Sequence, residues 1–137
     1  MARQRVLPHR PRTTVTMHEG DVIAVPLDDS AWGALHVVSL RRSGPVSRSA
    51  FVAGVLPWRG EAPPRAGDVE GLPVVAQALL GKELFTEGLL EIVANTPVVP
   101  TSLPNNFTDS GVIGARVNVW GWRAAIDQVR AWRPPQD

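Results

Sequence analysis

Two acidic pairs are the side chains whose spacing best suits acid–base chemistry. Asp28 and Asp29 are adjacent, and one residue separates Asp68 from Glu70. Two carboxylates held close together can divide the roles of general acid and general base between them. Both pairs lie in sequence typical of turns, where such side chains bond to nearby backbone groups and face solvent. We therefore expect no catalytic residue in either pair.

The histidines do not form a metal-binding pattern. His9, His18 and His36 are far apart, and no two are separated by the four residues of a helical zinc site. His36 lies in an apolar stretch, which is typical of a histidine in or beside a core. Cysteine is absent, which excludes thiolate ligands, thiolate nucleophiles and disulfides. Because the serine-hydrolase, phosphate-loop and dinucleotide patterns are also missing, we expect neither a metal nor a cofactor.

Tryptophan is the more unusual residue in this composition. The chain has five tryptophans and no tyrosine. A buried tryptophan usually fills a core. Trp58 and Arg59, however, stand at the start of an irregular, proline-rich interval, and these two residue types often anchor protein interfaces. We therefore predict that Trp58 and Arg59 contact a partner.

A β-hairpin is predicted to position the first acidic pair. Residues 18–38 contain two apolar runs rich in β-forming residues, separated by Asp28, Asp29 and Ser30. Gly33 permits a bulge or a close approach of another segment. We expect a surface loop at residues 57–71. Further strands are expected at residues 51–56, 73–80, 88–94 and 112–119, and a helix is the alternative for residues 73–80.

The end of the chain changes from strand to helix periodicity. Large apolar residues recur at steps of three and four before two prolines end the pattern. They are Trp122, Ala125, Ile126, Val129 and Trp132. The sequence therefore predicts a mostly β protein, a small partly open antiparallel barrel of the SH3-like kind, with a C-terminal helix packed on it.

Length and charge limit the domain organisation. A chain of 137 residues suits one domain, and its net charge of +1 is too small to indicate a nucleic-acid or membrane partner. Four arginines precede the first acidic residue; they are Arg3, Arg5, Arg10 and Arg12. We expect a flexible basic tail at residues 1–16, whose deletion leaves stability and binding nearly intact, and a single domain at residues 17–137.

No stretch has the apolar core of a signal peptide or the length of a membrane span. We therefore expect a soluble, cytoplasmic protein.

The opening hairpin carries a resemblance to a known family. Residues 19–29 read Glu-Gly-Asp-Val-Ile-Ala-Val-Pro-Leu-Asp-Asp, and Trp32 and Gly33 follow. This segment resembles the start of the immunity protein 26 family of bacterial polymorphic-toxin systems, in which a Gly-Asp-hydrophobic opening leads to a Pro-Leu-Asp hairpin. Residues 72–75 and 87–93 are similar in placement to later strands of that family, so the resemblance spans about residues 19–122.

The resemblance implies an immunity protein that binds and neutralises a cognate bacterial toxin by stoichiometric inhibition, with no enzymatic activity and no small-molecule substrate. We expect the toxin to contact Asp28, Asp29, Trp58 and Arg59, because an acidic turn would speed association with a basic nuclease and a desolvated aromatic would slow dissociation.

Two alternatives remain. The Gly-Asp-Val start of a small barrel also resembles endoribonuclease toxins of the MazF and PemK type. An arginine-rich tail would also suit a nucleic-acid-binding small barrel, although four arginines without an aromatic neighbour would hold RNA weakly.

Overall fold

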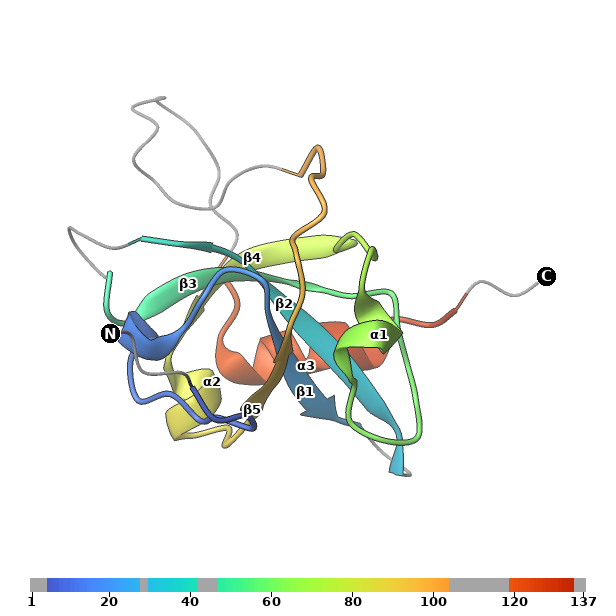
Figure 1. Cartoon of the computed structure of the whole chain (residues 1–137), viewed down its shortest axis with the longest axis horizontal. Helices are drawn as coiled ribbons and strands as arrows, with labels where there is room; N and C mark the ends of the chain where they lie inside the picture. Colours follow the sequence, from blue (N-terminus) through green and yellow to red (C-terminus); the bar gives the residue numbers. More distant parts are fainter. Residues whose placement is uncertain (1–4, 28–29, 42–46, 104–118, 135–137) are drawn as a thin grey trace.

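The computed structural model describes residues 5–27, 30–41, 47–103 and 119–134. Within these residues, five strands form one antiparallel sheet in the order β4-β3-β2-β1-β5 (Figure 1). Each of β1 to β4 pairs with its neighbour in sequence, whereas β5 returns to pair with β1. The strands are β1 (Asp21–Pro26), β2 (Trp32–Leu40), β3 (Ala50–Val55), β4 (Ala76–Gly81) and β5 (Glu91–Asn95).

Four helical segments accompany the sheet in the described part of the chain. They are the 3₁₀ turn η1 (Thr14–Thr16) and the helices α1 (Ala66–Val69), α2 (Glu83–Thr86) and α3 (Trp122–Ala131). The sequence predicted α3 but not the three short segments. Each of those has only one turn, which is too short to show a helical apolar period.

The sheet remains open because β4 and β5 form opposite edges and do not pair with each other. The predicted fold is confirmed: the chain is mostly β, with an antiparallel sheet that is not closed into a barrel and a helix near the C-terminus. The hairpin and the strand at residues 51–56 are confirmed. The strands expected at residues 73–80 and 88–94 correspond to β4 and β5, which each start three residues later than predicted. The expected strand at residues 112–119 lies outside the described residues, except that Val119 forms a parallel bridge with Leu79.

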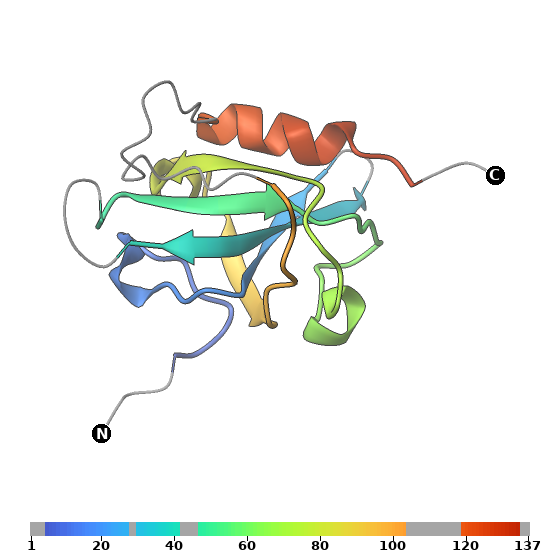
Figure 2. The same cartoon turned by 90° about the horizontal axis from the view of Figure 1, so that it is seen from above.

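The strands are buried on both faces, and each face contributes to a separate core. Side chains alternate across a strand, so Ile23 and Val25 enter the larger core while Val22 enters the smaller one. The larger core also receives Ala125 and Val129 from α3, and the smaller core receives Val69 from α1. Figure 2 accordingly shows α3 and α1 on opposite sides of the strands.

Helix α3 has the apolar face that its spacing predicts. Ala125 and Val129 are buried, and Trp122, Ile126 and Trp132 pack at the edges of the larger core. The helix lies so close to β2 that a Cβ atom on Gly33 would stand 2.4 Å from Cγ1 of Val129. Gly33 therefore sets the distance between the helix and the sheet.

Replacing Gly33 by alanine should destabilise the protein by about 1–3 kcal/mol, because the added methyl group overpacks the contact with Val129. The double variant Gly33→Ala/Val129→Ala should lose less stability than the sum of the two single variants, since the smaller side chain makes room for the new methyl. Urea denaturation of the four proteins measures this coupling. Strict additivity would show that the two residues do not compete for space.

Residues 5–16 pack along the sheet, which differs from the flexible tail expected from composition. His9 pairs with Ile92 of β5 through two backbone hydrogen bonds of 2.8 and 2.7 Å. Thr14 is buried, and its backbone N–H donates to the carbonyl of Arg48 at 3.0 Å. These contacts are hydrogen bonds between backbone groups. The apolar content of a segment does not indicate such bonds, so composition did not predict that residues 5–16 are ordered.

Arg5 makes the strongest side-chain contact of this segment. Its guanidinium donates two hydrogen bonds, of 2.7 and 2.8 Å, to the carboxylate of Asp21, which is 0% exposed at the start of β1. The same carboxylate accepts hydrogen bonds from the backbone N–H of His18 and the side-chain amide of Asn95. The carboxylate of Asp21 thus links the N-terminal segment to β1 and β5.

Helices long and apolar enough to cross a membrane do not occur in the described part of the chain.

Candidate protein-binding surface

The loop of Trp58 and Arg59 lies at the end of the sheet where the described residues on either side of Asp28 and Asp29 also lie. Trp32, the first residue of β2, exchanges two backbone hydrogen bonds of 2.8 and 3.0 Å with Gly60. This bridge fastens the loop of Trp58 and Arg59 to the end of the first hairpin. Asp28 and Asp29 lie outside the described residues, so only the flanking positions of their turn are placed.

Trp58 packs within the molecule. Its side chain is half-buried, lies against Gly60 and contacts the smaller core. These contacts account for a large aromatic side chain at this position. That Trp58 also contacts a partner stays a prediction.

Arg59 ties the same loop to α3. Its Nη2 atom donates a hydrogen bond of 2.9 Å to the carbonyl of Arg130, in the last turn of the helix. A cation is favoured there because the helix dipole places partial negative charge on the terminal carbonyls. Burial, together with repulsion from the guanidinium of Arg133, lowers the pKa of Arg59 from its ordinary value. Its contact with a partner likewise stays a prediction.

An apolar groove of about 210 Å³ lies beside this end of the sheet. Its lining combines one tryptophan and three prolines with aliphatic side chains and one carboxylate; these residues are Pro8, Ala24, Pro26, Trp32, Pro63, Leu89, Leu90, Glu91 and Val93. Proline loses almost no side-chain entropy when it is covered. The groove therefore presents rigid apolar surface to whatever contacts it.

Leu89 stands where this groove meets a second hollow. The second hollow measures about 550 Å³ and is lined by Arg10, Pro11, Arg12, Phe85, Thr86 and Leu89. The Leu89 side chain is 58% exposed, and its backbone is left-handed, with φ of 61°. This conformation costs a residue with a Cβ atom about 1–2 kcal/mol. Sequence reasoning missed it, because leucine rarely adopts a positive φ.

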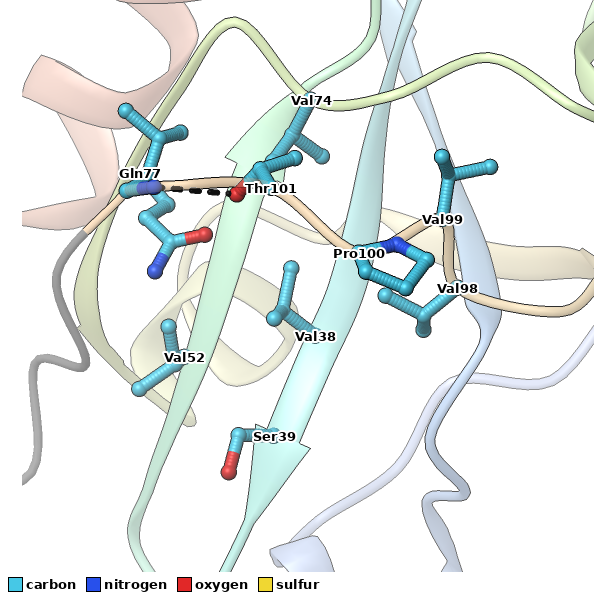
Figure 3. A pocket seen from close by; sticks show the side chains of 10 residues that line it. Val38, Ser39, Val52, Val74, Gln77, Val98, Val99, Pro100 and Thr101 are labelled. Carbon is cyan, nitrogen blue, oxygen red and sulfur yellow. Dashed lines mark hydrogen bonds between the residues drawn. The ribbon is translucent and has the colours of Figure 1, made fainter.

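A third hollow, of about 240 Å³, lies over the smaller core beside the segment of residues 98–103. Figure 3 shows Val38 of the sheet between Gln77 on one side and Val98 and Pro100 on the other, with Val52 below Gln77. Its walls are mainly β-branched and apolar. The chain continues from Leu103 into residues that are not described, and we assign the hollow no role.

A polar hollow of about 340 Å³ lies where η1 meets the ends of β2 and β3. It is lined by Thr14, Val15, Arg41, Ser47 and Arg48. Two guanidinium groups beside hydroxyl groups are chemistry that suits a phosphate or another anion.

His36 and Asp68 occupy structural positions. His36 is 1% exposed, and its Nε2 atom lies 3.0 Å from the carbonyl oxygens of both Gly20 and Thr96. This geometry assigns the proton to Nε2, which donates to both carbonyls. Asp68 caps α1 by accepting a hydrogen bond of 2.9 Å from the backbone N–H of Arg65. Both placements confirm the core-histidine and capping interpretations.

Among the residues that the structure places, no three His, Cys, Asp or Glu side chains come close enough together to hold a metal ion. No family model, curated protein or solved structure matches this chain.

Proposed function

We propose that this chain is an immunity protein, which binds a cognate bacterial toxin and neutralises it by stoichiometric inhibition without catalysing a reaction. The observation that carries the proposal is the open groove walled by Trp32, Pro26 and Pro63. The resemblance of residues 19–33 to the start of the immunity protein 26 family is the reason for proposing a bacterial toxin as the partner.

The groove suits a protein partner for a physical reason. Association costs free energy for every side chain that must be ordered, and the prolines of the groove have little freedom to lose. The backbone bridge between Trp32 and Gly60 holds the adjacent loop in place before any partner arrives. A rigid apolar groove with ordered edges is a surface on which an aromatic or aliphatic side chain of a partner can be buried.

The test uses the toxin domain encoded beside the gene of this chain. We expect the purified chain to form a 1:1 complex with that domain, to abolish its activity at equimolar concentration and to show no RNA cleavage of its own. Pro63→Glu should weaken the complex at least about 10-fold, because it introduces a carboxylate without a partner into a surface that becomes buried. Titration calorimetry and residual toxin activity measure both effects.

Pro73→Glu provides the matched control. Pro73 is also exposed and also lies in a loop, but it is not part of the groove lining. The control should bind with the affinity of the unmodified chain. Equal losses from the two variants would contradict the groove assignment, and the absence of a complex, or RNA cleavage by the chain itself, would overturn the proposed function.

Nucleic-acid binding is a second candidate function, and the polar hollow lined by Arg41 and Arg48 favours it. Two phosphate contacts to single-stranded RNA would make log K fall with log salt concentration with a slope of about −1.4. Fluorescence anisotropy of a labelled RNA across salt concentrations measures that slope. The immunity proposal expects no measurable binding at physiological salt.

A further inference from the structure

Leu89 combines an exposed apolar side chain with a backbone conformation that leucine rarely adopts. Its side chain is more than half exposed, and its backbone occupies the left-handed region just after α2. Among the described residues, only Ser30 and Leu89 reach positive φ without being glycine. Glycine would adopt this conformation without strain, whereas leucine adopts it at an energetic cost.

The position of Leu89 is held by the N-terminal segment. Nη2 of Arg10 donates a hydrogen bond of 2.8 Å to the carbonyl of Leu89 and lies 3.7 Å from a carboxylate oxygen of Glu91. The backbone N–H of Leu89 donates to the carbonyl of Phe85 at 3.1 Å. The strained residue is therefore fixed from both sides, and its side chain projects from an ordered support.

The surroundings of Leu89 define the chemistry of what covers it. One side is the proline and tryptophan groove, and the other is the larger hollow, in which Arg10 and Arg12 stand near the buried ring of Phe85. The described lining of that larger hollow contains two arginines and no acidic side chain. A complementary surface would place carboxylates opposite the arginines and an apolar cavity opposite the leucine.

We propose that Leu89 is the anchor residue of the toxin-binding surface, and that the toxin domain receives it in an apolar cavity bordered by carboxylates. This inference rests on the proposed function and identifies the residue that contributes most to binding. Buried apolar anchors of this kind dominate the affinity of protein complexes, while charged groups at their margin mainly govern the rate of association.

The experiment compares stability and toxin binding in the same variants. Leu89→Gly should leave the urea midpoint unchanged or raise it, because relief of the left-handed strain offsets the greater freedom of glycine in the unfolded chain. The same variant should raise the Kd for the toxin domain at least about 30-fold. Val75→Ala, which truncates an exposed apolar side chain outside both hollows, should change neither quantity. Arg12→Ala should lower the association rate and weaken its dependence on salt.

The possible outcomes distinguish a failure of the Leu89 anchor assignment from a failure of the proposed toxin-binding function. A toxin complex that Leu89→Gly leaves unchanged would overturn the anchor while the proposed function stands. A lower midpoint for Leu89→Gly would show that the side chain is structural and would also overturn the anchor. If the unmodified chain is a dimer that Leu89→Gly converts to a monomer, the surface serves self-association instead. The absence of any complex with the unmodified chain would overturn both proposals.

Discussion

Arg5→Ala should destabilise the protein by about 3–5 kcal/mol, although Arg5 precedes every strand of the sheet. The substitution leaves the buried carboxylate of Asp21 without the guanidinium that neutralises it, and breaking a buried ion pair by removing one partner carries a cost of this size. The loss is large compared with the total stability of a small domain, which is about 5–15 kcal/mol. Urea denaturation followed by tryptophan fluorescence measures it.

Two further variants separate charge from packing. Arg12→Ala removes an exposed arginine from the same segment and should change stability by no more than about 0.5 kcal/mol. Arg5→Ala/Asp21→Asn should recover part of the loss, because the amide carries no charge and keeps some of the hydrogen bonds. Deletion of residues 1–16 should be at least as harmful as Arg5→Ala. A fully stable deletion variant would restore the flexible-tail interpretation.

Gly20→Ala should lower the free energy of unfolding by at least about 3 kcal/mol, because two unfavourable effects add. Gly20 has φ of 91°, where a Cβ atom is strained, and that Cβ would lie 2.4 Å from the carbonyl oxygen of Thr96. This oxygen belongs to the backbone and accepts a hydrogen bond from His36, so it cannot move aside without breaking a buried contact. Chemical denaturation measures the loss.

Two other glycines provide matched controls for Gly20. Gly71 also has a positive φ, of 84°, but a Cβ there would meet no atom within 4 Å, so Gly71→Ala isolates the backbone strain of about 1–2 kcal/mol. Gly67 lies in α1 with open space around it, so Gly67→Ala should be neutral or slightly stabilising. Equal losses for Gly20→Ala and Gly71→Ala would show that the contact with Thr96 is not tight.

Apolar runs and helical periodicity in the sequence determined most of the fold. The runs rich in β-forming residues on either side of Asp28 and Asp29 predicted β1 and β2, whose side chains are buried on both faces of the sheet. The steps of three and four from Trp122 to Trp132 predicted α3, because burial of one helix face imposes a period that survives in the sequence. Proline and glycine marked the loops. The same patterns also suggested an antiparallel, partly open arrangement, since neighbouring strands joined by short connections pair with each other.

Tertiary structure alone decided how the buried polar residues are paired and that Leu89 is exposed. Arg5 lies in an arginine-rich, proline-containing stretch that resembles a disordered tail, and only its approach to Asp21, 16 residues away, makes it part of the fold. His36 is fixed by the carbonyl of Gly20, just before β1, and by that of Thr96, just after β5. Leu89 takes a conformation that its own type disfavours, and its carbonyl accepts a hydrogen bond from Arg10, 79 residues earlier. Local sequence reports the preferences of single segments, whereas these positions are set by contacts between segments far apart in the chain.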